Sequence, residues 1–138
     1  MPLYPPGSDS GGPIFGSDFT DVVDETETST TSATYQDKLT LVTPAWTGRY
    51  RLGLNVISRM SVKNKNGWIR IYNVTNAVVE WEGSYQPAAA NTEQFPFCGF
   101  HYVTLAGVAK TYKLQFRSED GATTIYVWDA HLDLWRVN

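Results

Sequence analysis

Residue types that build common catalytic and structural sites are scarce in this sequence. Among 138 residues it has one cysteine, Cys98, and two histidines, His101 and His131. A lone cysteine excludes an internal disulfide and a zinc site closed by cysteines. The sequence also has no G-x-S-x-G nucleophile elbow and no glycine-rich phosphate loop that opens a helix. The usual signatures of hydrolases and nucleotide-binding enzymes are therefore missing, and no cofactor is expected.

Long apolar runs and early positive charges are missing too. No run approaches the roughly 18 apolar residues that a membrane-spanning helix needs, so no membrane partner is expected. No Lys or Arg precedes Lys38 and there is no apolar h-region, which predicts a protein made in the cytoplasm without a signal peptide. A pI of about 5.2 argues against nucleic acid as a partner.

Charge is distributed unevenly along the chain. Residues 1–37 contain seven Asp and Glu and no Lys or Arg, whereas residues 38–138 contain all eleven Lys and Arg and the other seven acids. Such asymmetry indicates either a solvated acidic leader or electrostatic docking within or between molecules. We expect residues 18–27 to run along a basic surface of the same chain or an adjacent copy, with Phe19 and Val22 or Val23 packing beneath.

Composition divides the chain into three regions. Residues 1–17 form a Pro/Gly-rich extended arm, residues 18–34 an acidic Thr/Ser-rich extended segment, and residues 35–138 a domain with the texture of β-strands. The prolines and glycines of the arm exclude a helix or a central strand. The arm nevertheless carries four apolar side chains that a solvated tail does not need: Leu3, Tyr4, Ile14 and Phe15.

Alternation predicts the strands. In residues 49–60, Tyr50, Leu52, Leu54, Val56 and Met60 share one parity, and Arg49, Arg51, Asn55 and Arg59 share the other. Successive side chains of a strand point to opposite faces, so this pattern predicts a half-buried strand with a basic outer face. The same reasoning sends Tyr126, Trp128, Ala130, Leu132 and Leu134 inward near the C-terminus and leaves Trp135 outside.

The sequence as a whole predicts an all-β fold. Seven or eight strands in about a hundred residues, with one long irregular stretch at 84–96, describe a two-sheet antiparallel β-sandwich. The strand lengths favour a jelly roll, ahead of an immunoglobulin-like sandwich, with the extended N-terminal arm attached.

Aromatic residues are the richest functional signal. Of the five tryptophans we expect about three in the core, while Trp46 lies in a predicted turn and Trp68 directly follows one. Exposed aromatics on a sandwich bind sugars by stacking or anchor protein interfaces. Trp46 and Trp68 are therefore the candidates for a glycan-binding groove.

Two sets of polar residues are candidates for a chemical site. Asp129, His131 and Asp133 would share one face of the last strand, where they would form either a metal-dependent site or an ordinary solvated face. The solvated face is favoured, and no metal site is predicted. Cys98 and His101 fall on opposite faces of a strand, so Cys98 is expected to be a small buried apolar side chain.

The sequence also resembles one type of protein. The stretch "DETETSTTSATYQDKLTLVTPAW", the strand start "GRYRLGLNV" and the ending "DAHLDLWRV" resemble, in texture and order, small β-sandwich virion proteins of tailed bacteriophages. Members of this type are capsid decoration or cement proteins, head fibres and tail-fibre tips. The resemblance implies a non-enzymatic virion protein, commonly a homotrimer, that binds a major capsid protein or another virion subunit.

The resulting hypothesis is a structural interaction protein. The arm and the basic strand face would bind partners, and the candidate residues are Leu3, Tyr4, Ile14, Phe15, Phe19, Arg49, Arg51 and Arg59. The alternative is a carbohydrate-binding or receptor-binding tip that uses Trp46 and Trp68. A metal-dependent enzyme using Asp129, His131 and Asp133 has the least support.

Overall fold

The computed structural model describes residue 14 and residues 17–137, and in this part of the chain all regular structure is β-strand. The described residues contain no helix that is long and apolar enough to cross a membrane. The strands are β1 (Phe19–Asp24), β2 (Thr28–Thr30), β3 (Gln36–Val42), β4 (Thr47–Met60), β5 (Gly67–Asn73), β6 (Val78–Tyr85), β7 (Gln94–Ala106), β8 (Thr111–Ser118) and β9 (Ile125–Arg136).

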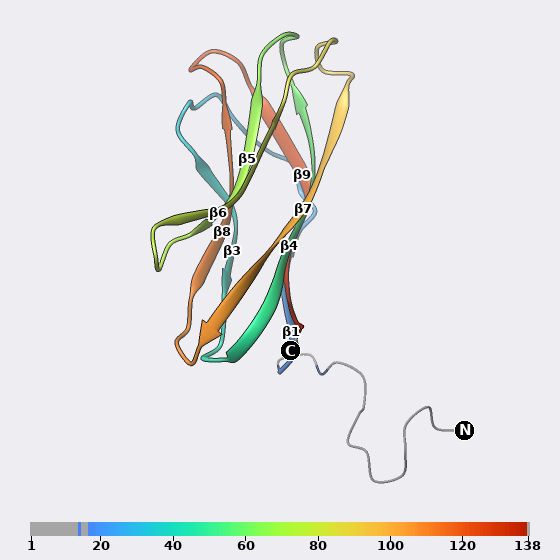
Figure 1. Ribbon diagram of the computed structural model, residues 1–138. Coiled ribbons are helices and arrows are strands. Elements are labelled where there is room, and N and C mark those ends of the chain that lie inside the picture. The colour runs from blue at the N-terminus through green and yellow to red at the C-terminus, as the bar shows by residue number, and fades with distance from the viewer. Residues whose placement is uncertain (1–13, 15–16, 138) are drawn as a thin grey trace, which may run out of the picture.

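The strands form two antiparallel sheets packed face to face (Figure 1). The first sheet has the order β1-β9-β4-β7, with β2 also pairing with β9, and the second has the order β3-β8-β5-β6. The pairs β3–β8, β4–β7 and β5–β6 are nested like the two arms of one long hairpin, and alternate pairs fall in alternate sheets. A long hairpin folded over in this way is a jelly roll, as the sequence predicted.

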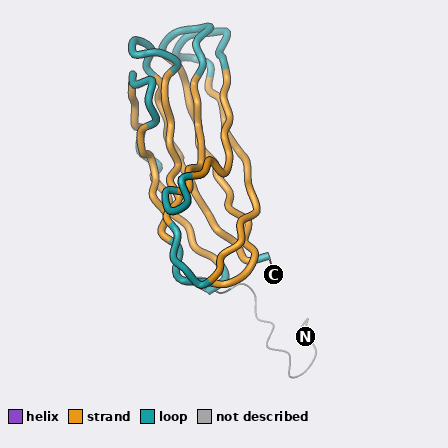
Figure 2. The backbone as a smooth tube through the Cα atoms, turned by 60° about the vertical axis from the view of Figure 1, so that its left-hand side comes forward, coloured by secondary structure: helices purple, strands orange, loops and turns teal. Residues whose placement is uncertain are grey.

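Alternating apolar side chains place the core between the sheets. The inward set predicted on β4 is confirmed, since each member is at most 4% exposed. In the first sheet, β9 adds Ala130, Leu132 and Leu134 beside this set. The facing layer comes from β5 and β8 of the second sheet and includes Ile69, Ile71, Tyr112, Leu114 and Phe116. The loops gather mainly at the two ends of the elongated sandwich (Figure 2), so both outer sheet faces remain open to partners.

The prediction for the first half of β9 is wrong, because the strand contains a β-bulge. Asn55 of β4 lies opposite His131, whereas Ile57 lies opposite Trp128, so β9 has one extra residue between these pairs. Asp129 occupies that position with φ 48°, a left-handed conformation that Asp tolerates better than most residues. The bulge switches the parity, and Ile125 and Val127 are buried in place of Tyr126 and Trp128.

The expected tryptophan core is also wrong. None of the five tryptophans is fully buried, and only Trp46 and Trp81 pack, partly buried, against the core. Tyr50, Tyr112 and Phe116 are the large aromatic side chains that fill the interior. The tryptophans are thus left at the margins and on the outer faces.

The acidic segment contributes β1 and β2 to the first sheet. Both pair with β9, with Phe19 opposite Trp135 and Ser29 opposite Tyr126. Residues 18–34 therefore share hydrogen bonds with the sandwich, and β1 forms one edge of its first sheet. Of the arm expected at residues 1–17, only Ile14 and Ser17 belong to the described residues.

Candidate interaction surface

The outer face of the first sheet brings aromatic and arginine side chains from four strands into adjacent rows. Arg51 of β4 lies opposite Trp135 of β9 on one side and Tyr102 of β7 on the other. Phe19 of β1 extends the row beyond Trp135, and their rings are 4.2 Å apart. We call this surface the aromatic–arginine face, and it comprises Phe19, Arg49, Arg51, Phe100, Tyr102 and Trp135.

Each arginine of this face lies over an aromatic ring. The guanidinium of Arg49 is 4.4 Å from the ring centre of Tyr102, and that of Arg51 is 4.6 Å from the ring centre of Phe100. Phe100 and Tyr102 meet edge to face at 5.5 Å and are 47% and 44% exposed. Cation–π contacts of this kind hold the guanidinium groups in place without neutralising their charge.

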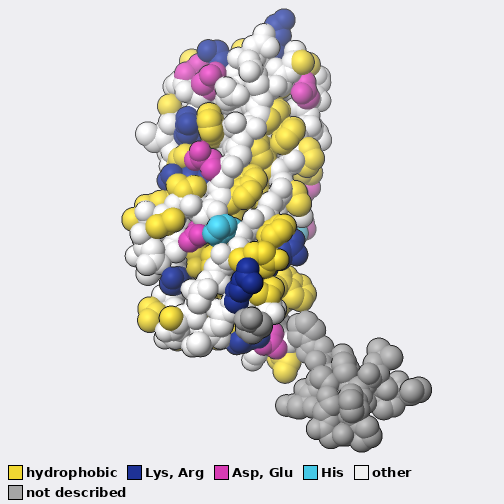
Figure 3. All heavy atoms as spheres, viewed as in Figure 1, with side chains coloured by type: hydrophobic (Ala, Val, Ile, Leu, Met, Phe, Trp, Pro, Cys, Tyr) yellow, Lys and Arg dark blue, Asp and Glu magenta, His cyan; other side chains and the backbone are white. Residues whose placement is uncertain are grey.

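The two arginines keep unpaired charges on the aromatic–arginine face. Within residues 17–137, neither guanidinium forms an ion pair within 4.0 Å. Hydrophobic side chains form a band along the face drawn in Figure 3, with Lys and Arg side chains at its lower end. Exposed rings beside preorganised arginines are the residue types that dominate protein interfaces.

A carboxylate is built into the centre of the same face. Asp133 sits against Gly53 of β4, where a Cβ atom would come within 2.7 Å of its Oδ1. A glycine in the middle of a long strand is thus explained by the close approach of this side chain. Burial raises the pKa of Asp133, the positive charge of Arg51 lowers it, and the negative charge of Asp21 raises it, with a net upward shift.

The acidic segment is fastened to its own chain. The ammonium of Lys38, whose side chain is 1% exposed, contacts Asp24 Oδ2 at 2.8 Å and the main-chain oxygen of Thr26 at 2.7 Å. This hydrogen bond from Lys38 is the largest cause that lowers the pKa of Asp24 to about 2. Glu27 reaches Arg59 at 3.2 Å. Of the three arginines expected to meet this segment, the described contacts pair it only with Arg59.

The apolar residues of the segment divide between the two sides of β1. Val22 packs against the core, Phe19 lies on Trp135, and Val23 is 45% exposed. Residues 18–24 therefore dock in cis as an edge strand. At the start of the described chain, Ile14 is 62% exposed, and Leu3, Tyr4 and Phe15 lie outside the described residues.

The outer face of the second sheet uses the same residue types differently. Arg70 lies over Tyr35 at 4.0 Å and over Tyr72 at 4.4 Å. The Nε of Arg70 also donates to Gln115 at 2.8 Å, and the amide of Gln115 donates to Asp37 at 2.7 Å. We call this surface the paired face. Its connected side chains are those of Tyr35, Asp37, Trp68, Arg70, Tyr72, Glu82, Lys113, Gln115 and Arg117.

Tyr35 closes the paired face. Its hydroxyl donates to Glu82 Oε2 at 2.8 Å. Burial, followed by this bond to Glu82, raises the pKa of Tyr35 to about 12. Arg117 lies over Trp68 at 4.6 Å, which leaves the indole half-buried. The polar groups of this face are thus satisfied within the chain.

The structure does not bring Trp46 and Trp68 together. Trp46 directly precedes β4 and stacks on Tyr50 at 5.3 Å, whereas Trp68 belongs to β5, beyond the other end of β4. They lie at opposite ends of the sandwich, so no single groove contains both. The exposed rings that do lie together are those of Phe100 and Tyr102. Their alternation in residues 98–104 was readable in the sequence, but nothing in that pattern distinguished them from other strand residues.

The polar residues of β9 face outward around the bulge. Asp129 and His131 line a hollow of about 300 Å³ together with Asn55, Ile57 and Pro96. Among the residues described, no group of three or more His, Cys, Asp or Glu side chains is arranged to hold a metal ion. Cys98 is exposed, so the expectation that it is buried is wrong. Cys98 belongs to the edge strand β7, which has a neighbouring strand, β4, on one side only.

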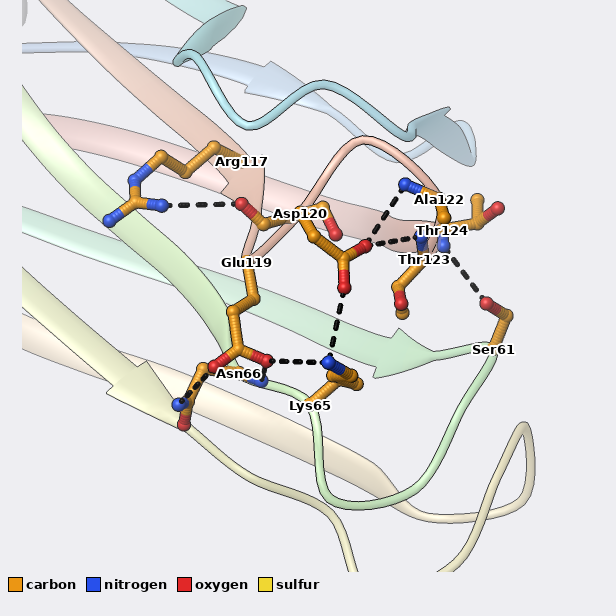
Figure 4. A network of polar contacts seen from close by, with 10 residues as sticks. Ser61, Lys65, Asn66, Arg117, Glu119, Asp120, Ala122, Thr123 and Thr124 are labelled. Atoms are coloured by element: carbon orange, nitrogen blue, oxygen red, sulfur yellow. Dashed lines mark hydrogen bonds and ion pairs between the residues drawn. The ribbon is translucent and has the colours of Figure 1, made fainter.

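A separate polar network fixes the loops at one end of the sandwich (Figure 4). Asp120 accepts main-chain hydrogen bonds from Ala122 at 3.0 Å and Thr123 at 2.8 Å, and Lys65 reaches its other oxygen at 3.2 Å. The first two bonds are the largest causes that lower the pKa of Asp120 to about 2. The network connects the loops after β4 and β8, and it is a structural clamp.

Comparisons with known proteins show the fold and no closer kinship. No model of a protein family matches the chain, and no curated protein matches it. The VP2 subviral particle of infectious bursal disease virus superposes with a TM-score of 0.61 at 10% identity over 86% of this chain. T=1 particles derived from the same virus give a TM-score of 0.59 at 9% identity over 86% of this chain. This chain thus has a β-sandwich fold that a viral particle protein also has.

The likeness covers only part of those viral chains. The matched region is 32% and 31% of their respective lengths. Both of these proteins are viral, as the resemblance to virion modules led us to expect, but neither is a tailed-phage protein. At this level of identity the likeness shows the fold alone.

Proposed function

We propose that the chain is a non-enzymatic structural protein of a virus particle and that its aromatic–arginine face contacts a neighbouring virion subunit. The fold that this chain shares with viral particle proteins supports a place in a virus particle. The observation that carries the proposal is the stacking of Arg49 and Arg51 on the exposed rings of Tyr102 and Phe100, with no ion pair within 4.0 Å to either arginine in the described chain. Such a face is preorganised, so little side-chain entropy is lost when a partner covers it.

The finer role that we propose is capsid decoration or cement. A compact sandwich of this kind binds at the surface of a shell, and the arm adds a second attachment. Leu3, Tyr4, Ile14 and Phe15 would be buried on the partner. Prolines favour extended conformations, which reduces the entropy lost when the arm binds.

Add-back to particles tests this role. Virus particles that lack the chain are mixed with the purified protein, and bound protein is measured after density-gradient sedimentation. The wild-type chain is expected to bind saturably, and Arg51→Glu is expected to weaken binding at least about tenfold, because charge reversal at a buried contact costs more than about 1.4 kcal/mol. Arg117→Lys, on the paired face, is the matched control and should bind as the wild type does.

A chain without residues 1–17 checks the arm in the same assay. It should fold but fail to join the particle. Equal binding of the wild type and Arg51→Glu would overturn the role of the face, and equal binding of the truncated chain would overturn the role of the arm. Failure of the wild-type chain to bind any particle would overturn the virion role itself.

The second candidate is a glycan-binding or receptor-binding tip. It is favoured by the exposed rings of Phe100 and Tyr102, because aromatic faces stack on sugars. A glycan array read by tryptophan and tyrosine fluorescence separates the two functions. Saturable binding to a defined sugar, abolished by Tyr102→Ala and retained by Trp68→Ala, would favour this candidate over the structural one.

A further inference from the structure

The free edge of β7 differs from the other sheet edges. β7 ends the first sheet and pairs only with β4. It is 13 residues long and contains no Asp, Glu, Lys or Arg. The edge strands β1, β3 and β6 each carry two charged residues, and β2 has only three residues. Proteins commonly protect sheet edges with charges, and a long uncharged edge is a site of strand pairing.

Hydrogen bonding around β4 shows which groups lie along this edge. The main-chain oxygen of Arg49 accepts from Val137, next to β9, and that of Trp46 accepts from Gly107, next to β7. Odd-numbered residues of β4 thus turn their main-chain groups toward β9 and even-numbered ones toward β7, because the direction alternates along a strand. In the β4–β7 register the even residues face odd residues of β7, such as Leu52 opposite His101.

The even-numbered residues of β7 therefore turn both main-chain groups outward. They are Cys98, Phe100, Tyr102 and Thr104, and Pro96 ends the run because it has no N–H. No main-chain hydrogen bond from these four residues to the rest of the described chain occurs at this edge. His101 turns to the inner side, where Glu80 lies 3.4 Å away, so it leaves the edge uncovered.

We propose that β7 pairs with β7 of a second copy of this chain, antiparallel about a two-fold axis at His101. In this register Phe100 lies opposite Tyr102 of the other copy, and Cys98 lies opposite Thr104. Every outward group from Cys98 to Thr104 is paired, and the stretch stops before Pro96. The edge is neutral and meets its own copy without repulsion, whereas two copies of β1 or β6, with two acids each, would repel.

Side chains support the same register. Phe100 and Tyr102 lie on the outer face and are about half exposed. Pairing places each Phe100 ring beside the Tyr102 ring of the other copy, and such aromatic cross-strand pairs stabilise antiparallel strands. The two first sheets become one continuous sheet. The pair is two-fold, in contrast to the trimer that the resemblance implies, and it does not depend on the virion role.

Thr104→Pro tests the pairing in the full-length chain. The N–H of Thr104 faces outward and takes no part in the β4 ladder, so proline removes a bond between copies and keeps those to β4. The wild type is expected to be a dimer by sedimentation equilibrium. Thr104→Pro should weaken its association at least about tenfold, and Thr104→Val, which keeps the N–H, should remain a dimer. A monomeric or trimeric wild type, or a dimeric proline variant, would overturn the proposal.

Cross-linking tests the register even where the proline variant does not fold. Residues opposite each other in a hydrogen-bonded pair have Cα atoms about 5.5 Å apart, within disulfide range. Thr104→Cys should therefore form covalent dimers with Cys98 of the other copy when oxidised glutathione accepts the two electrons and two protons. The wild type, and Thr104→Cys combined with Cys98→Ser, should stay monomeric on a non-reducing gel. Equal cross-linking in the wild type, or none in Thr104→Cys, contradicts this register.

Discussion

The two outer faces of the sandwich contain similar residues in different states. On the paired face, Arg70 lies between two tyrosines and also bonds Gln115, which in turn bonds Asp37. On the aromatic–arginine face, Arg49 and Arg51 lie over rings but have no described carboxylate within 4.0 Å. The same chemistry thus stabilises the fold on one face and remains available to a partner on the other.

The difference follows from which acids each sheet contains. Asp37 and Glu82 lie among the basic and aromatic groups of the second sheet and satisfy them within the chain. Asp18, Asp24 and Glu27 of the acidic segment bind Arg136, Lys38 and Arg59. These acids are thereby engaged at the rim of the first sheet, and none of them forms an ion pair with Arg49 or Arg51.

The largest expected effect comes from the inner side of β7. A Cβ atom on Gly99 would lie 2.4 Å from Nε1 of Trp81, whose ring is also held against Gly83. Gly99→Val should displace this indole from the gap between β6 and β7 and lower the free energy of unfolding by about 3 kcal/mol, the upper end of the usual cost of overpacking, because three atoms of a rigid ring lie within 3.0 Å of the added Cβ. Urea denaturation measures it. Gly121→Ala, where nothing lies within 4 Å, is the control and should be near neutral. If Gly99→Val is as stable as the wild type, the Trp81 ring does not occupy the space beside Gly99.

The next effect compares the two faces directly. Gln115 is 9% exposed and connects Arg70 to Asp37. Gln115→Leu leaves both without this partner and should lower the free energy of unfolding by about 1–3 kcal/mol. Tyr102→Ala removes a half-exposed ring and a cation–π contact, and should cost less than about 1 kcal/mol. Thermal and urea unfolding of both variants provide the measurement. The reverse order would contradict the division of the faces into stabilising and binding surfaces.

The sequence was sufficient for the fold because the apolar alternation is long. On β4 the inward positions from Tyr50 to Met60 are all apolar except Ser58, and all of them are buried. On β9 a single residue, Asp129, changes the parity, and no local pattern announces a bulge that depends on pairing with β4. Alternation therefore predicted the second half of β9 correctly and the first half incorrectly.

The sequence predicted only part of the candidate surface. Alternation placed Arg49 and Arg51 on the outer face, and they lie there. That Tyr102 and Phe100 lie beneath them depends on the register between β4 and β7, and residues 61–93 separate these two strands along the chain. Long-range register is a property of the folded sheet, so local patterns could identify the arginines but not the rings that hold them.

The smallest effects sharpen the comparison within the first sheet, where two carboxylates have opposite pKa shifts. The hydrogen bond from Lys38 lowers the pKa of Asp24 from 3.8 to about 2, so its charged form stabilises the fold above pH 3.8 and this stabilisation is lost as the pH falls toward 2. Burial raises the pKa of Asp133 in the folded protein, so the protonated form of this side chain is the one that the fold favours. The resulting stabilisation is fully present below the pKa of the unfolded chain and is lost as the pH rises through the raised, folded-state pKa. Asp24→Asn should therefore lower the free energy of unfolding at pH 7, and the difference from the wild type should shrink in acid.

Asp133→Asn should raise the free energy of unfolding at pH 7, and its difference from the wild type should disappear below about pH 3.8. Urea titrations of the wild type and both variants at pH 7 and pH 3 measure the four differences. If Asp133→Asn destabilises the protein at pH 7, the attraction of Arg51 outweighs burial, and the central carboxylate neutralises the aromatic–arginine face although it forms no ion pair with Arg51 within 4.0 Å.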